Sequence, residues 1–398
     1  MIAPDADACK RLSGSLLGKA STRRIVPLYT AKLACYGGRT LQMTTMPLEV
    51  ALELTPRARF DVINVRERAS AAFPGALDPF PRCLYYSFHT TAGYLEQGLA
   101  SRLTKQCAGV GPYVNVFRRL FPEGAAYAHD RLERRPELTR AQRAVEPRNA
   151  DSHLAFIAGG LRTCVSYRNR PADPVCFVDL DGVHQSQARR RLTTIIGYTR
   201  EEDVARLSIP VAVSAHAVDS INLKDPRHGV YEQCGALIAR HGVTQGRVRL
   251  ELAPGERHAG LTVNEYETLL MRHDLADVLS NPLRYAAEKG RHMWANPRAI
   301  PARTLDYAKY DMVRTFNDVF DALGLGESIV QRVLSRAIAL PAARFLRMKR
   351  SVSLLVSDRG SAGRGAIIDG AYQSPILVQW HSATCRSREI IATLSRFS

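Results

Sequence analysis

The sequence predicts an α+β protein of two tandem domains, each a mixed or antiparallel β-sheet with packed helices. The first observation is an internal repeat, because three kinds of segment recur in the same order. The second is that each repeat alternates short β-rich runs with an amphipathic helix, as α+β domains do. The paired segments are 52–73 with 219–242, 84–97 with 247–267, and 189–199 with 387–397.

The first pair of segments predicts a strand and a turn followed by an amphipathic helix, and the second predicts an apolar strand with a polar signature. The third predicts a final strand with a basic start. Residues 268–350 have apolar spacing near 3.6 and a helix start at GESIV, which predicts a helical insertion. We therefore expect an N-terminal extension (1–44), a first domain (45–203) and a second domain (208–398) that contains the insertion.

The composition limits the class of protein and of partner. The 398 residues are enough for two cores, and no apolar run approaches the roughly 18 residues of a membrane span. The net charge is +17, but 47 of the 55 basic residues are arginines scattered along the chain. No basic stripe alternates with aromatic residues, so we expect no specific nucleic-acid partner and favour a small anionic substrate. The eight cysteines form no CxxC pair, which favours the cytoplasm.

Polar motifs of the first repeat carry the candidate chemistry. They are FHTTAG (His89, Thr90, Thr91), YAHD (Tyr127, His129, Asp130) and NADSH (Asn149, Asp151, His153). Neutral imidazoles ligate divalent metals, and neighbouring carboxylates can fix their tautomers, so a Zn or Mg site at the three histidines is one interpretation. Protonated imidazoles with threonine hydroxyls would instead hold phosphate.

Together and in order, these motifs resemble the YjbQ-like family of small trimeric α+β proteins. The resemblance covers most of residues 45–200. It returns in the second half through LTVNEYETLLMRHDL (261–275), GAYQSPILVQW (370–380) and SREIIATLSRF (387–397). It implies a homo-oligomer and an activity like secondary thiamine-phosphate synthase, which joins a pyrimidine diphosphate to a thiazole phosphate. The altered motifs favour a different substrate in a specialised biosynthetic pathway.

The two repeats depart from the family pattern in complementary ways. The first has Gln97-Gly98 where the family has Asn-Glu, whereas the second keeps Asn264-Glu265. In the second, Glu256 falls on the family's first histidine. We therefore hypothesise one composite site per chain, made by facing domains of one chain or of neighbouring chains.

The predicted site residues fall into two groups. The catalytic group is His89, His129, His153, Asp151 and Glu265, with the three histidines as metal ligands. The substrate-binding group is Thr90, Thr91, Tyr127, Asn149, Asn264, Gln373, Arg386 and Arg388. Asn149 and Asp151 are also expected to cap a helix and orient His153.

The predicted function is an enzyme that acts on a phosphorylated or anionic small molecule, and two alternatives stay open. One is a non-catalytic binding or scaffold protein. The other is a phosphatase of the haloacid-dehalogenase type, because VCFVDLDGVH (175–184) places Asp179 as nucleophile and Asp181 as acid and base. No downstream acidic pair completes its magnesium site, and a strand with an Asp-Gly turn also explains the segment.

Overall fold

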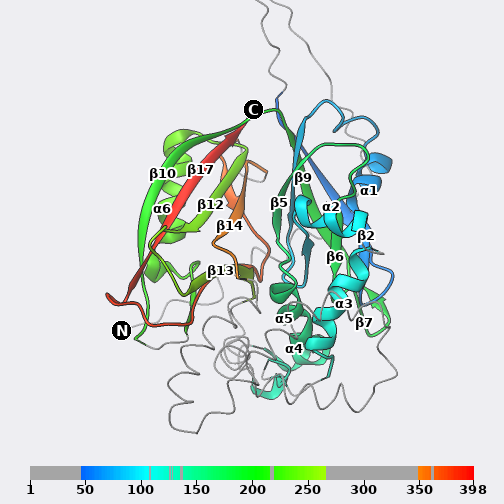
Figure 1. The fold of residues 1–398 in the computed structure, drawn as a ribbon, viewed down its shortest axis with the longest axis horizontal. Coiled ribbons are helices and arrows are strands. Elements are labelled where there is room, and N and C mark those ends of the chain that lie inside the picture. Colours follow the sequence, from blue (N-terminus) through cyan, green and yellow to red (C-terminus); the bar gives the residue numbers. More distant parts are fainter. Residues whose placement is uncertain are drawn as a thin grey trace, which may run out of the picture. The chain divides into compact units, whose positions relative to one another are not determined.

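The computed structural model describes residues 46–106, 109–124, 127, 129–134, 138–215, 219–265, 348–359 and 363–398. The predicted N-terminal extension lies outside these residues, and so does the predicted helical insertion up to residue 347. The predicted α+β class is confirmed, because the described chain combines antiparallel sheets with separate helices (Figure 1).

The first half contains a four-stranded and a three-stranded antiparallel sheet. In spatial order the larger has β1 (Leu48–Leu54), β9 (Arg191–Tyr198), β3 (Arg82–Ser87) and β5 (Cys164–Arg168), and the smaller has β2 (Asp61–Asn64), β6 (Cys176–Asp179) and β4 (Ala92–Tyr94). The helices are α1 (Val65–Ala72), α2 (Gln97–Gln106), α3 (Val110–Leu120), η1 (Leu132–Arg134), α4 (Arg140–Val145) and α5 (Ala150–Ala158). A two-stranded hairpin of β7 (Val183–His184) and β8 (Gln187–Ala188) follows β6.

The second half repeats this strand order. Its larger sheet has β10 (Glu201–Ala212), β17 (Ser387–Phe397), β12 (Gly246–Leu252), β14 (Ser351–Ser357) and β15 (Ala366–Ile368), and its smaller has β11 (Asp219–Asn222), β16 (Ser374–Gln379) and β13 (Ala259–Asn264). The helices η2 (Pro226–His228) and α6 (Val230–His241) follow β11 as α1 follows β2. Apart from the edge strand β15, the two halves have the same strand order, with β10 in the place of β1. This repetition supports our proposal of a duplication.

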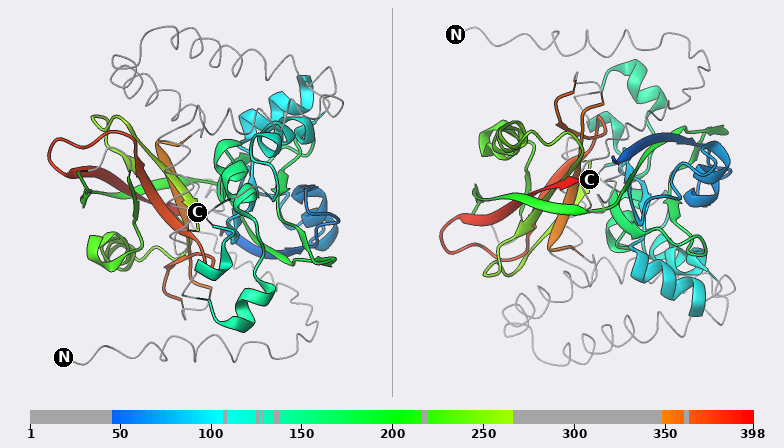
Figure 2. Two further views of the ribbon diagram at one scale, coloured as in Figure 1. Left: turned by 90° about the horizontal axis from the view of Figure 1, so that it is seen from below. Right: turned by 90° about the horizontal axis from the view of Figure 1, so that it is seen from above.

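Each half buries the facing sides of its two sheets. Along β12 the buried positions alternate with half-buried ones, as a strand with one face on a core requires. Its Val248 and Leu250 share a core with Leu261 of β13 and Leu377 of β16. The helix α6 covers the larger sheet with Cys234 and other residues one helical turn apart (Figure 2).

The helix α5 is packed against strands of both halves. All its residues except Asp151 are buried. Its Leu154 and Phe156 share one core with Val178 of β6 and with Ile376 and Val378 of β16. The burial of apolar groups from both halves therefore fixes α5, which carries His153.

A second contact between the halves is made by Gln373 and by Gly370, where the two backbones come very close together. Gln373 is 1% exposed and donates hydrogen bonds to the carbonyls of Ser87 (2.8 Å) and His89 (3.0 Å). Beside it, a Cβ atom added at Gly370 would lie 2.0 Å from the carbonyl oxygen of Phe88. Because that neighbour is backbone, any residue larger than glycine requires the backbone at this contact to shift.

We predict that Gly370→Ala lowers the free energy of unfolding by about 2–3 kcal/mol, since the extra methyl group overpacks a backbone contact. The matched control is Gly235→Ala in α6, where an added Cβ meets nothing within 4 Å. It should raise stability by about 0.5–1 kcal/mol, because alanine is the better helix former. Urea denaturation of both variants tests this, and equal effects would contradict the close approach.

Candidate metal centre

Three buried side chains converge where the halves meet. One ligand atom from each of His129, His153 and Glu265 lies within 4.8 Å of the others. The two histidines are 0% exposed and Glu265 is 8% exposed. The imidazole rings lie 5.1 Å apart, centroid to centroid. His153 comes from α5 of the first half, whereas Glu265 directly follows β13 of the second, so the structure brings residues of both halves together within one chain.

The orientation of His153 is set across the boundary between the halves. Its Nδ1 lies 2.7 Å from Oδ1 of Asn264. That oxygen also accepts a hydrogen bond from the backbone N–H of Glu265 (2.7 Å), which fixes it as the acceptor. Nδ1 of His153 is therefore the donor, and Nε2 of the neutral ring carries the lone pair. This Nε2 lies 3.3 Å from Oε2 of Glu265.

Asp130 orients His129 in the same manner. Its Oδ1 lies 2.9 Å from Nδ1 of His129 and accepts a hydrogen bond from the backbone N–H of Ala150 (3.1 Å). A carboxylate oxygen only accepts, so Nδ1 of His129 donates and Nε2 is the nitrogen that remains for a ligand. Asp130 thus joins the first residue of α5 to the histidine, and both imidazoles have the outer hydrogen bond that is typical of metal ligands.

The electrostatic surroundings favour a positive charge at His153. Burial alone lowers its pKa, but the hydrogen bond and charge of Glu265, followed by the contact with Asn264, outweigh burial and raise the pKa above its usual value. A cation between the imidazole and the carboxylate meets the same favourable field. Metal binding at such a group displaces the proton.

Two imidazoles and a carboxylate fit zinc better than magnesium. Magnesium prefers oxygen ligands, whereas imidazole ligands suit zinc and other transition metals. Ligand atoms around a tetrahedral zinc lie about 3.3 Å apart, so the group within 4.8 Å needs only a small contraction. Three protein ligands also leave a fourth position for water or substrate, as catalytic zinc sites do.

His89 lies outside this group, in contrast to our prediction that it is a metal ligand. Its Nε2 accepts a hydrogen bond from the backbone N–H of Leu192 (2.9 Å). Burial, together with Arg191 and Arg189, lowers the pKa of His89 to about 3. The ring is therefore neutral, and its basic nitrogen is used to hold β9.

Asp179 is equally committed to structure, which argues against the phosphatase interpretation. It is 0% exposed and accepts two hydrogen bonds from the guanidinium of Arg191, at 2.7 and 2.9 Å. The backbone N–H of Asp181 donates to the same carboxylate (3.0 Å). A carboxylate enclosed in this way cannot approach a phosphorus atom.

The second half contains a related cluster with the charges exchanged. Arg388 corresponds to Arg191 and donates to Oε1 of Gln379 (3.0 Å), which takes the place of Asp179. The carboxylate is now Glu256, which accepts from Arg388 (2.8 Å) and from the backbone N–H of Glu389 (2.8 Å). Glu256 therefore does in the second half what His89 does in the first. Arg388 is buried by these contacts, so it does not form the predicted substrate contact.

Asn149 and Asp151 were both expected to cap α5 and orient His153, and their side chains have other partners. Asn149 occupies the N-cap position of α5 without a side-chain cap, and its Nδ2 donates to Oδ2 of Asp181 (2.7 Å). Asp151 accepts two hydrogen bonds from Arg59, at 2.9 and 3.0 Å. Asp130 supplies the missing cap.

The other predicted binding residues have structural contacts. The carbonyl of Thr90 accepts from Nδ2 of Asn264 (3.4 Å), and that of Thr91 accepts from the N–H of Leu180. The hydroxyl of Tyr127 donates to the carbonyl of Pro122 (3.1 Å). Gln373 connects the halves, as described above. Arg386 is exposed, with a φ of 48°, in the turn before β17.

Two residues near the site were not among the predicted ones. Asp130 is part of YAHD, and its adjacency to His129 was the available signal. Arg189 belongs to the basic run before β9 and pairs with the buried Asp181. Arg189 lies beside Asp181 because β7 and β8 pair as a hairpin, so no local sequence pattern predicts this ion pair.

Comparison with known proteins finds similarity among solved structures. No family model and no curated protein matches. A YbjQ-like protein of unknown function from Sulfolobus solfataricus is 14% identical, with a TM-score of 0.27, over 50% of this chain and 99% of its own. A hypothetical protein from Aeropyrum pernix is 12% identical, with a TM-score of 0.28, over 48% and 98%. An uncharacterized protein of the YjbQ family from Clostridium acetobutylicum is 14% identical, with a TM-score of 0.23, over 47% and 98%. The chain is thus similar to YjbQ-like proteins over about half of its length.

In the described part of the chain, no helix combines the length and the apolar character that crossing a membrane requires.

We predict that Asp179→Gln lowers the free energy of unfolding by about 3 kcal/mol, because it leaves the buried charge of Arg191 without a carboxylate. Adding His89→Glu copies the arrangement of the second half and should recover at least half of the loss. A double-mutant cycle by urea denaturation measures this coupling. If the losses in free energy of unfolding of Asp179→Gln and His89→Glu simply add in the double variant, then the carboxylate introduced by His89→Glu does not compensate for the missing carboxylate of Asp179.

Proposed function

We propose that the chain is a metal-dependent enzyme that acts on a phosphorylated or otherwise anionic small molecule. The metal is zinc or a similar transition metal, held by His129, His153 and Glu265. The observation that carries this proposal is the convergence of the three ligand atoms within 4.8 Å, with both imidazoles oriented by a hydrogen bond at Nδ1.

The burial of the group supports a functional role. Two imidazoles and a carboxylate removed from water are costly unless they are paired or coordinate a metal. An apolar core would stabilise the junction of the halves at lower cost, yet the chain keeps these groups where α5 meets β13. A metal bound there supplies a Lewis acid for a phosphoryl or carbonyl oxygen, or a water of lowered pKa.

The chain's own residues would hold and orient this chemistry. Asn264 and Asp130 keep the two imidazoles in the tautomer with a basic Nε2. Glu265 offers the anionic ligand, and its backbone N–H fixes Asn264. For the reaction we propose group transfer with a pyrophosphate leaving group, like that of thiamine-phosphate synthases, as the first class to test. We also propose that the chain forms a homo-oligomer.

We predict that zinc-loaded protein contains close to one metal per chain and that His153→Ala and Glu265→Gln lose it. Removal of one of three ligands, or of an orienting hydrogen bond, weakens metal affinity by at least about tenfold. His89→Gln is the matched control, since it replaces a histidine of the same half that holds only backbone. Elemental analysis after dialysis decides, and metal lost by His89→Gln and His153→Ala but retained by Glu265→Gln would favour the ligand set of three histidines instead.

Turnover is tested by release of pyrophosphate from a pyrimidine diphosphate in the presence of a thiazole phosphate, and then with other phosphorylated substrates. We expect turnover that requires the metal and that is absent in Glu265→Gln. The non-catalytic alternative predicts normal metal content without turnover of any phosphorylated compound, and that result would overturn the enzymatic proposal.

A further inference from the structure

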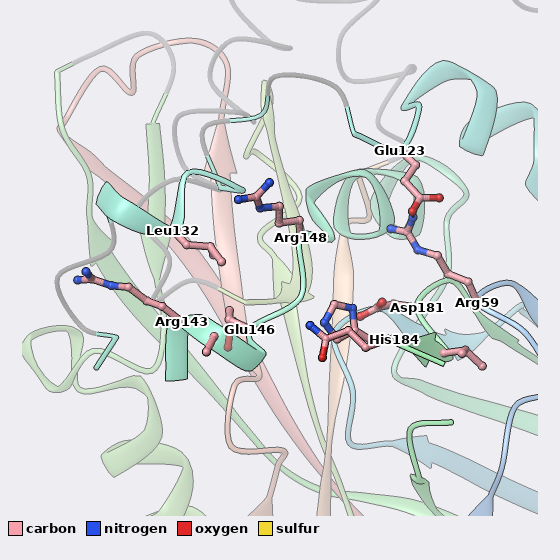
Figure 3. Close-up of a pocket in the computed structure, with 11 residues that line it drawn as sticks. Arg59, Glu123, Leu132, Arg143, Glu146, Arg148, Asp181 and His184 are labelled. Atoms are coloured by element: carbon pink, nitrogen blue, oxygen red, sulfur yellow. The ribbon is translucent and has the colours of Figure 1, made fainter. Parts of the chain in front are cut away.

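A cavity of about 450 Å³ lies beside Asp181 (Figure 3). It is bordered by α4, by the segment before α5 and by the β7–β8 hairpin. Its volume is within the range of small-molecule sites. Three arginines and a histidine line it together with three acidic residues, so its preference depends on which of these charges are already paired.

Two acidic residues and one arginine that line the cavity already have hydrogen-bond or ion-pair partners. Arg59 extends toward Glu123 and forms ion pairs with it and with Asp151 (Figure 3). Asp181 accepts from Asn149 and pairs with Arg189. These contacts pair Glu123 and Asp181, two of the three carboxylates that line the cavity, and the third is Glu146.

Donors remain on the opposite side. Arg148 is exposed and has no hydrogen bond or ion pair within the described part of the chain. Nε2 of His184 is buried and has no hydrogen-bond partner among the described residues. A guanidinium and an imidazole without partners, facing one cavity, are the groups that bind phosphate oxygens. Arg143 also lines the cavity, but it already interacts with another group, so we do not include it.

The cavity shares a wall with the metal centre. Asp181 lines the cavity and accepts from Asn149, which directly precedes α5. The next residue, Ala150, donates to the carboxylate of Asp130 that orients His129. A ligand seated in the cavity therefore lies beside the start of α5, where Asp130 orients His129.

The hairpin that carries His184 has a strained turn. Its two-residue loop, Gln185-Ser186, has φ values of 48° and 63°, a conformation that favours glycine or asparagine. Such strain, of order 1–3 kcal/mol per residue, persists where surrounding contacts impose it. Val183, His184 and Gln185 of this hairpin line the cavity.

We propose that this cavity binds the phosphate or pyrophosphate group of a small phosphorylated ligand through Arg148 and His184. It holds the anionic end of the substrate while the metal centre acts on the adjoining atoms. Only this last assignment, of the ligand as substrate, rests on the proposed function.

The test is a calorimetric titration of metal-free protein with inorganic phosphate and with pyrophosphate. Wild type should bind at least one of them, and Arg148→Ala and His184→Ala should each weaken binding by at least about tenfold, the effect of one charge-assisted hydrogen bond. The matched control is Arg240→Ala, an exposed arginine on α6, which should leave affinity unchanged. Binding that is absent in wild type, or equal in Arg148→Ala and wild type, overturns the proposal.

A further variant separates this proposal from the metal centre. His129→Ala should lose the metal yet keep phosphate affinity within about twofold, since the wall residues Asn149 and Asp181 are unchanged. Loss of phosphate binding in His129→Ala but not in Arg148→Ala would place the anion at the histidines and contradict the cavity assignment.

Discussion

The hydrogen bond between His153 and Asn264 is the interaction on which the candidate site depends. It crosses the boundary between the halves, and it selects the tautomer in which Nε2 faces Glu265. The backbone N–H of Glu265 holds Asn264 in the required orientation. Because His153 is fully buried on α5, this geometry exists only when β16 packs against that helix and Asn264, at the end of β13, reaches the imidazole. Docking of the halves and assembly of the site are therefore one event.

The two halves share a strand order but differ in the polar residues around a buried arginine. Each places a buried arginine near the start of its last strand, and each holds the following backbone N–H with a side chain from the loop before its β4 or β13 strand. In the first half that side chain is His89 and the carboxylate is Asp179; in the second it is Glu256, with Gln379. In each half the buried arginine is thus paired with one carboxylate, although the carboxylate comes from a different position in the two halves.

The same comparison accounts for a single composite site at the described junction. When Ala92 of β4 is matched with Ala259 of β13, the positions of Asn264 and Glu265 are occupied by Gln97 and Gly98. Gly98 offers no ligand, and Gln97 instead bonds to Arg168 and Asp173 within the first half. A carboxylate is therefore present at only one of the two equivalent positions.

Part of this could be predicted from sequence, for physical reasons that differ between residues. The α+β class follows from local periodicity, and the repeat makes the strand order of the halves agree. His129, His153 and Glu265 stand in short polar motifs that occur in the same order as in the family the sequence resembles, and this order indicates a site. His89 has the same local appearance, but strand pairing places the N–H of Leu192 against its ring. The roles of Asp151 and Asn149 likewise depend on Arg59 and Asp181, which are distant in sequence and carry no local signal.

The most direct measurement of the central claim is anomalous diffraction at the zinc edge from crystals of the full chain soaked with zinc. The account predicts a peak about 2.0–2.2 Å from an imidazole nitrogen of His129, one of His153 and an oxygen of Glu265. A peak bound instead by the exposed pair His258 and His381, whose rings lie 5.3 Å apart, with none at the buried group, would contradict it.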